Sequence, residues 1–167
     1  MSFRDHDDHF NCVCDVVHFI NDLQDAADED LNNNCPTNCL NPVLGGNENK
    51  PYKRKNTRPF ILYTRDGKPF EAFFKPNEGS HACPCDKEGK KIYDKIDFFC
   101  KSMFFRVENI EGCCALLRVL EPECTTSPCP EVDNPQKNLH LSDSCITVDL
   151  SNFIAIQCLD DIHLPGC

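Results

Sequence analysis

Residues 60–74 read FILYTRDGKPFEAFF, and this stretch decides the fold class. Two short runs of aromatic and branched residues, Phe60–Thr64 and Phe70–Phe74, flank the polar segment Arg65–Pro69. Such runs are typical of β-strands. The Asp-Gly pair inside the polar segment accepts the positive φ angles that a tight turn requires. The stretch therefore predicts an antiparallel β-hairpin.

Strand signals of the same kind continue toward the C-terminus. The runs FFRVE (104–108) and CALLRVL (114–120) flank NIEG (109–112), which predicts a second hairpin with Arg106 and Arg118 on exposed strand edges. A third group follows, made of LHL (139–141), the alternating run CITVDL (145–150) and FIAIQC (153–158). These segments predict a sheet of several short antiparallel strands.

The N-terminal part of the chain carries the one helical signal. Val13, Val16, Val17 and Ile20 recur at spacings of three and four, which is the period of an amphipathic helix. With one helix and several hairpins, we expect a mainly β fold: an antiparallel β-sandwich or open barrel with one N-terminal amphipathic helix and cysteine-bearing loops.

The length of 167 residues fits a single folded domain. The expected organisation, in chain order, is a polar N-terminal tail (1–12), an amphipathic helix (13–30), an Asn/Pro/Gly-rich loop (31–58), one β-rich domain (59–160) with an insertion (75–100) and a loop (121–140), and a C-terminal tail (161–167).

Charge and hydropathy exclude several function classes. The net charge of -10 argues against nucleic acid as a partner, because phosphate binding needs a basic surface. The basic stretch 50–58 (KPYKRKNTR) reads as a solvated loop or as a contact for an acidic neighbour in an assembly.

No apolar stretch approaches the roughly 20 residues that span a bilayer, so no membrane is expected. The first ten residues lack an apolar signal region, and we expect synthesis in a reducing cytoplasm without a signal peptide.

Fourteen cysteines are unusual for a chain made in such a compartment. They would bind a metal, perform redox chemistry or become oxidised later, outside a living cytoplasm. Redox enzymes of the thioredoxin type use Cys-x-x-Cys, and that spacing is absent from the sequence. No phosphate loop, G-x-S-x-G element or metalloprotease helix pair occurs, so we expect no enzyme, no catalytic residue and no cofactor. A single thiol nucleophile hidden among the cysteines stays open as an alternative.

Zinc binding is the main alternative to later oxidation as an explanation for the cysteines. His81, Cys83 and Cys85 place nitrogen and sulfur ligands close together, as does the segment from His9 to Cys14. Structural zinc normally needs four ligands in matched pairs, and neither cluster has a second pair nearby. A zinc-stabilised adaptor that recruits other proteins is therefore the alternative function.

Oxidation of the thiols after synthesis explains the positions of the remaining cysteines. Thiols in loops and tails are those that reach another chain most easily. On a strand, the adjacent Cys113 and Cys114 point to opposite faces, so one faces outward. Cys114 and Cys158 are expected as buried, unreactive thiols. The candidates for disulfides or cross-links are Cys12, Cys14, Cys35, Cys39, Cys83, Cys85, Cys113, Cys124, Cys129 and Cys167.

Five blocks of the sequence resemble a known family. In order along the chain they are CVCDVVHFINDLQDA (12–26), CPTNCLNP (35–42), NTRPFILYTRDGKPFEAF (56–73), FFRVENIEGCCALLRVL (104–120) and CITVDLSNFIAIQCL (145–159). Together they resemble the cysteine-rich spore outer-coat and exosporium proteins of Bacillus-type bacteria, the CotY, CotZ and ExsY family. One departure is at 152–158, which read NFIAIQC where the family pattern is nearer CFCAIQC, so two cysteines are absent.

The resemblance implies a structural role on the spore surface, in the outer coat, crust or exosporium. Such proteins are made in the mother cell, assemble with copies of themselves into ordered two-dimensional lattices of hexameric character, contact other coat proteins and become cross-linked by disulfides. The missing cysteines imply thinner cross-linking near the C-terminus.

Overall fold

The computed structural model describes residues 12–26, 39, 55–75, 100–123 and 130–166. Its first element is the helix α1 (Cys12–Asp25). The apolar positions at helical spacing are buried, as the sequence predicts, with Val17 and Ile20 fully enclosed. The helix begins one residue before the expected start, and residues 27–30 of the expected helix lie outside the described residues.

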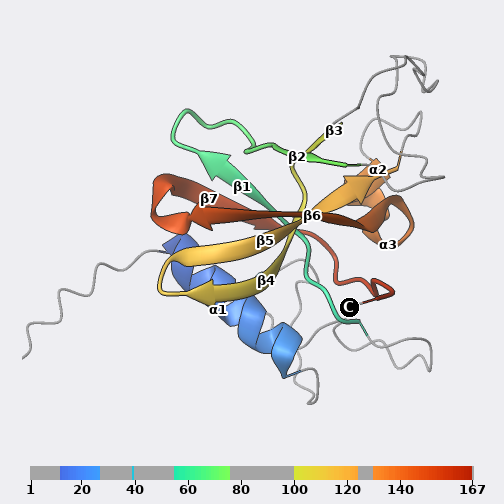
Figure 1. The fold of residues 1–167 in the computed structure, drawn as a ribbon, viewed down its shortest axis with the longest axis horizontal. Coiled ribbons are helices and arrows are strands. Elements are labelled where there is room, and N and C mark those ends of the chain that lie inside the picture. Colours follow the sequence, from blue (N-terminus) through green and yellow to red (C-terminus); the bar gives the residue numbers. More distant parts are fainter. Residues whose placement is uncertain (1–11, 27–38, 40–54, 76–99, 124–129, 167) are drawn as a thin grey trace, which may run out of the picture.

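Five strands form one antiparallel sheet in the order β6-β5-β4-β1-β7. Their bounds are β1 Phe60–Thr64, β4 Phe105–Glu111, β5 Cys114–Pro122, β6 Leu139–Asp149 and β7 Phe153–Cys158. The edge strands β6 and β7 do not pair with each other, so the sheet is open. Figure 1 shows α1 at one end of the fold and β2 (Ala72–Phe74) with β3 (Cys100–Ser102) at the other, with the sheet between them. The expected mainly β, antiparallel fold class with one N-terminal helix is confirmed.

The first predicted hairpin forms only in part. Gly67 adopts a φ of 77° in the predicted turn, and Phe70 N donates to Leu62 O over 2.8 Å. Beyond this point the chain leaves β1, and β2 pairs with β3 instead. The expectation that Phe70–Phe74 forms the second arm of the hairpin was wrong. Phe74 explains the departure, because it is fully buried in the core that β2 shares with the sheet.

The second predicted hairpin is present and longer than expected. Glu111 pairs with Cys114, so the turn is Gly112-Cys113 rather than 109–112, and Gly112 has a φ of 56°. Both arms are interior strands. Arg106 and Arg118 are therefore cross-strand partners on one face of the sheet, not residues on exposed edges.

The C-terminal third contains more regular structure than the sequence indicated. The loop expected at 121–140 includes the short helices α2 (Pro130–Asp133) and α3 (Pro135–Asn138). The strand β6 then runs without a break from Leu139 to Asp149, and the turn η1 (Leu150–Asn152) leads into β7. Alternation along β6 is regular enough to keep one side of the strand facing solvent.

Two buried clusters stabilise the two faces of the sheet. The larger one joins α1 to inward residues of every strand of the sheet and to Phe74 of β2. The smaller one contains Phe104, Leu120 and Leu139 together with residues after β7. Ile162 and Leu164 are almost fully buried there, so 161–166 is a packed segment rather than the expected tail. This segment covers one end of the outer face and leaves the other end open.

Candidate functional site: the cysteines and the outer sheet face

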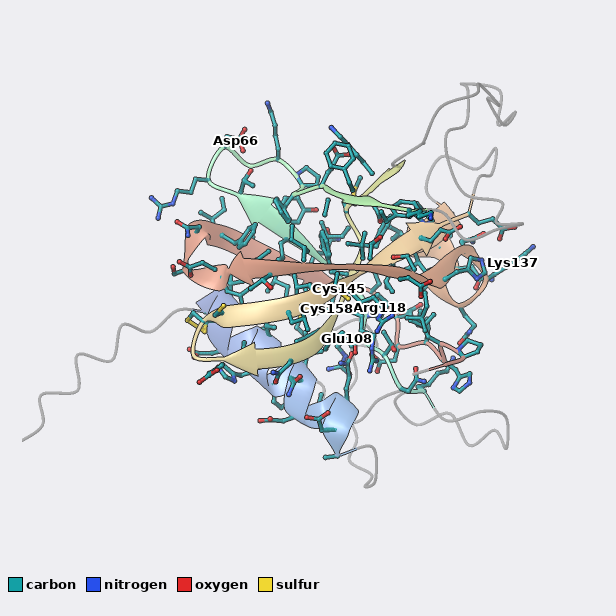
Figure 2. All side chains as sticks on the ribbon, viewed as in Figure 1. Asp66, Glu108, Arg118, Lys137, Cys145 and Cys158 are labelled. Carbon is teal, nitrogen blue, oxygen red and sulfur yellow. A yellow bond between two sulfur atoms is a disulfide. The ribbon has the colours of Figure 1, made fainter. Side chains whose placement is uncertain are left out.

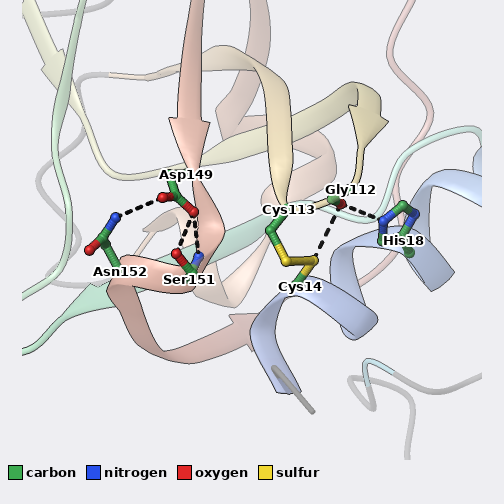
Figure 3. Close-up of a disulfide and its surroundings, with 7 residues drawn as sticks. All are labelled: Cys14, His18, Gly112, Cys113, Asp149, Ser151 and Asn152. Atoms are coloured by element: carbon green, nitrogen blue, oxygen red, sulfur yellow. Dashed lines mark hydrogen bonds between the residues drawn. A yellow bond between two sulfur atoms is a disulfide. The ribbon is translucent and has the colours of Figure 1, made fainter. Parts of the chain in front are cut away.

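A disulfide joins the first turn of α1 to the β4–β5 turn (Figure 3). Cys14 and Cys113 bond with a Cα–Cα distance of 5.3 Å across a sequence separation of 99. His18, one helical turn after Cys14, donates from Nε2 to the carbonyl oxygen of Gly112 over 2.6 Å. The Cys14 sulfur lies 3.4 Å from the same oxygen, and because a disulfide sulfur carries no proton this is a packing contact. The helix is thus fixed to the turn by one covalent bond and one hydrogen bond.

A second disulfide, Cys39–Cys158, ties the chain before the sheet to the end of β7. The carbonyl of Cys39 accepts from Arg58 Nη1 over 2.9 Å. Arg58 is itself buried and makes two further hydrogen bonds to the carboxylate of Asp161, at 2.8 and 2.9 Å. Charge-assisted pairs of this geometry are strong, and a buried one is costly to break from one side. The pair holds the start of β1 against the segment that follows β7.

Three described cysteines are free and exposed: Cys12, Cys114 and Cys145. Cys114 and Cys145 lie on the same outward face, because Cys114 pairs with Asp149 and Cys145 pairs with Arg118 in one continuous register. Figure 2 shows Cys145, Arg118 and Glu108 close together near the middle of the sheet. Arg118 Nε donates to Glu108 Oε1 over 2.6 Å, and Arg106 Nε reaches the same oxygen over 3.3 Å.

The end of the outer face near Cys114 is acidic. Asp149 accepts a hydrogen bond from the Ser151 hydroxyl, which lowers the pKa of the Asp149 carboxyl below its usual value (Figure 3). It also accepts from Ser151 N and Asn152 Nδ2 and so caps the η1 turn. Glu111 lies on the other side of Cys114 and is exposed. Cys114 therefore lies between two carboxylates, whereas Cys145 lies beside Arg118 and on the same side of β6 as the exposed Asp143.

The cysteines expected from the sequence fall into three groups. Cys14, Cys39 and Cys113 are in disulfides within the chain, whereas Cys12 is free. The expectation of a buried thiol was wrong for Cys114, which is exposed. Cys158 is buried as expected, but it is bonded to Cys39 and is not a free thiol. The remaining predicted site residues lie outside the described residues: Cys35, His81, Cys83, Cys85, Cys124, Cys129 and Cys167.

Cys145 was not among the predicted site residues, although a signal for it existed. In the alternating run 145–150, Cys145 shares its side of the strand with Thr147 and Asp149, which are polar. A cysteine on the polar side of an alternating strand faces solvent. The period of the strand therefore indicated an exposed thiol.

Neither a metal centre nor a membrane helix is found among the described residues. No cluster of three or more His, Cys, Asp or Glu side chains in that part of the chain has a geometry that could hold a metal ion. Cys14, one of the residues considered for zinc, is engaged in a disulfide. Within the same ranges, no helix has the length and apolarity needed to cross a bilayer.

Comparison with known proteins gives a consistent result. The sequence model of the family "Spore coat protein Z" matches residues 1–161. Spore coat protein Z of Bacillus subtilis (strain 168) is 30% identical over 155 residues, which cover 90% of this chain and 89% of that protein. No solved structure matches the fold. The match extends over both disulfides and the exposed thiols of the outer face, and the chain belongs to the spore coat protein Z family, whose members are structural proteins of the bacterial spore coat.

Proposed function

We propose that this protein is a structural subunit of the spore surface that assembles with copies of itself into an ordered two-dimensional layer, contacts other coat proteins, and is hardened by disulfides between subunits. Family membership supports the location in the coat. The observation that carries the cross-linking is the division into two classes of the cysteines whose side chains the structure describes, which are either bonded within the chain or free on the surface.

The two classes suit different tasks. The disulfides Cys14–Cys113 and Cys39–Cys158 close long loops, and a cross-link of this kind stabilises a domain chiefly by restricting its unfolded state. The exposed thiols of Cys12, Cys114 and Cys145 add nothing to the core and are accessible to another chain. Several interchain bonds per subunit would keep a layer intact when any single contact is lost.

The test is to purify the protein without reductant, image it by negative-stain electron microscopy and run the same sample on gels with and without reductant. Ordered sheets whose chains migrate as monomers only after reduction are expected. A control sample is alkylated under native conditions, which caps exposed thiols and spares the disulfides. Alkylated protein should still associate but should run as a monomer without reductant. A monodisperse monomer of unchanged mobility in the untreated sample would refute the proposed function.

A further inference from the structure

The strand β7 forms one edge of the five-stranded sheet. Its only strand neighbour among the described residues is β1, so the other side of its backbone pairs with no strand of that part of the chain. Edge strands expose a row of N–H and C=O groups, and soluble proteins usually protect such a row with charged side chains, proline, bulges or a very short strand. An edge without this protection is a place where a further strand can add to the sheet.

The register determines which backbone groups of β7 point away from β1. Leu159 N donates to Pro59 O over 2.9 Å, and these two residues are directly opposite when the β1–β7 register is continued by one position. Hydrogen-bonded and non-hydrogen-bonded pairs alternate along antiparallel strands. Leu62 and Ile156 therefore form a non-hydrogen-bonded pair, which agrees with the bond from Phe70 N to Leu62 O on the far side of β1. The N–H and C=O groups of Ile156 thus point outward from the sheet.

The outward side of β7 lacks most of the usual protection. A bulge at Ile154 interrupts the register near the start of the strand, but the pairing from Ala155 to Cys158 is regular. No charged residue occurs from 150 to 159, which is the longest such run among the described residues. Ala155 and Gln157 are exposed, and Ile154 is 58% exposed, so side chains along this edge are open to solvent.

The opposite edge strand, β6, carries charges that β7 lacks. Asp143 and Asp149 lie on β6 and are both exposed. Charged side chains of this kind keep an edge strand from pairing with another chain. The whole chain has a net charge of -10, so two copies repel each other on approach. Of the two edges, the uncharged β7 is the one where a second copy meets the weaker repulsion.

We propose that a second copy of this chain pairs its β7 antiparallel with this β7, across a two-fold axis at Ile156, and so joins the two sheets into one. This inference rests on the proposed function and names one contact between subunits. A two-fold axis perpendicular to a sheet relates two antiparallel copies of the same strand, and each copy offers the other the same groups. The axis lies at Ile156 because this residue is inside the regular stretch and has both backbone groups pointing outward.

The axis sets which residues are opposite each other between the two copies. Ala155 of one copy is opposite Gln157 of the other, in a non-hydrogen-bonded pair with Cα atoms about 4.5 Å apart. The two Ala155 residues are displaced by two strand positions and lie about 8 Å apart, and the same holds for the two Gln157 residues. Ile154 lies at the end of the paired segment, where part of its exposed apolar surface becomes buried.

Ala155→Cys and Gln157→Cys test this register by complementation. Both side chains are exposed, so neither change alters the core. A disulfide needs Cα atoms within about 7 Å of each other, so neither variant should bond to itself at the new cysteine. When isotope-labelled Ala155→Cys protein is mixed with unlabelled Gln157→Cys protein and oxidised glutathione, mass spectrometry should detect a 155–157 cross-linked peptide made of one heavy and one light chain. Peptides linked 155–155 or 157–157, or no link at either position in associated protein, would overturn the inference.

Ile156→Pro tests the backbone hydrogen bonds. Proline removes an N–H that points away from β1, and edge strands tolerate proline at such positions. By symmetry two intersubunit bonds are lost, so association should weaken about thirtyfold, or about 2 kcal/mol, beyond the effect of Ile156→Ala. The alanine control shortens the same half-buried side chain and keeps the N–H.

Analytical ultracentrifugation measures this association after exposed thiols are alkylated under native conditions, and circular dichroism checks that each variant is folded. Equal association of the folded proline and alanine variants would contradict pairing through β7. The cysteine variants test the same contact and do not depend on how the fold tolerates proline.

The same samples separate this inference from the proposed function. Ordered, reductant-sensitive sheets without the 155–157 link would overturn the β7 contact and leave the structural function standing. A monomer that forms neither sheets nor interchain bonds would overturn both.

Discussion

Removing the Cys14–Cys113 disulfide should destabilise the subunit by an amount that its loop sizes set. The bond spans a sequence separation of 99, and a loop of that size corresponds to about 4.7 kcal/mol in the chain-entropy model. The loop closed by the second disulfide, Cys39–Cys158, overlaps this one, so it shortens the connection between Cys14 and Cys113 in the unfolded chain. About 25 residues separate Cys14 from Cys39 and about 45 separate Cys113 from Cys158, so the effective loop is about 70 residues and the limit falls to about 4.4 kcal/mol.

The perturbation is the double variant Cys14→Ala/Cys113→Ala, which leaves no unpaired thiol. Because measured effects usually fall below the entropic limit, we expect a loss of about 2–4 kcal/mol in the free energy of unfolding. This is a large part of the roughly 5–15 kcal/mol that holds a typical domain folded. The measurement is urea unfolding of the isolated monomer fraction, followed by circular dichroism.

The matched control is Cys12→Ala, which removes an exposed free thiol two residues before Cys14. Its unfolding midpoint should equal that of the unmodified chain. Amide hydrogen exchange should show faster opening of α1 in the double variant, because the bond fixes its first turn. A loss below about 0.5 kcal/mol, with α1 still protected, would refute the view that this bond anchors the helix.

Three further predictions concern the fold. Asp161→Ala leaves the buried guanidinium of Arg58 without its carboxylate and should cost about 3–5 kcal/mol in urea unfolding, whereas the exposed neighbour Asp160→Ala should cost almost nothing. Gly112→Ala forces a Cβ into a φ of 56° and should cost about 1 kcal/mol, most of which Gly112→Asn should recover because Asn tolerates this conformation. The pKa of Asp149 is lower in the folded chain than in the unfolded chain, where it is near 3.8, so the carboxylate contributes stability above that pH and the contribution is lost as the pH falls through the folded pKa. The difference in unfolding free energy between the unmodified chain and Asp149→Asn should therefore shrink from pH 5 to pH 2. A constant difference would contradict this prediction.

Local signals predicted the parts of the fold that depend on local contacts. The helical spacing of Val13 to Ile20 and the glycine at 112 are readable because a period or a turn needs only neighbours in sequence. The sequence did not predict that β2 pairs with β3 and not with β1, because the burial of Phe74 depends on strands more than 40 residues away in the chain. The burial of Ile162 and Leu164 was not predicted, for the same reason. In the sequence alone such a short apolar pair looks like part of a tail, and the surface that buries it exists only in the folded sheet.

The cysteine site shows the same division. Alternation along 145–149 was sufficient to predict that Cys145 is exposed. The pairing of Cys14 with Cys113 could not be predicted from the sequence, because fourteen thiols allow a very large number of combinations and the choice depends on where α1 packs. The placement of Glu111 beside Cys114 on the outer face also required the structure, because the bulge between Val107 and Asn109 shifts the register that pairs them.

The adjacent cysteines at the β4–β5 turn have a mechanical consequence. Cys113 is bonded to the helix, and the next residue, Cys114, presents its thiol to the outside. Tension applied at Cys114 passes through a single peptide unit to the Cys113 sulfur and from there into α1, entirely along covalent bonds. The hydrogen bonds between β4 and β5 do not lie in series with that load. A subunit pulled at this point would distribute the force into its helix and core before its hairpin could unzip.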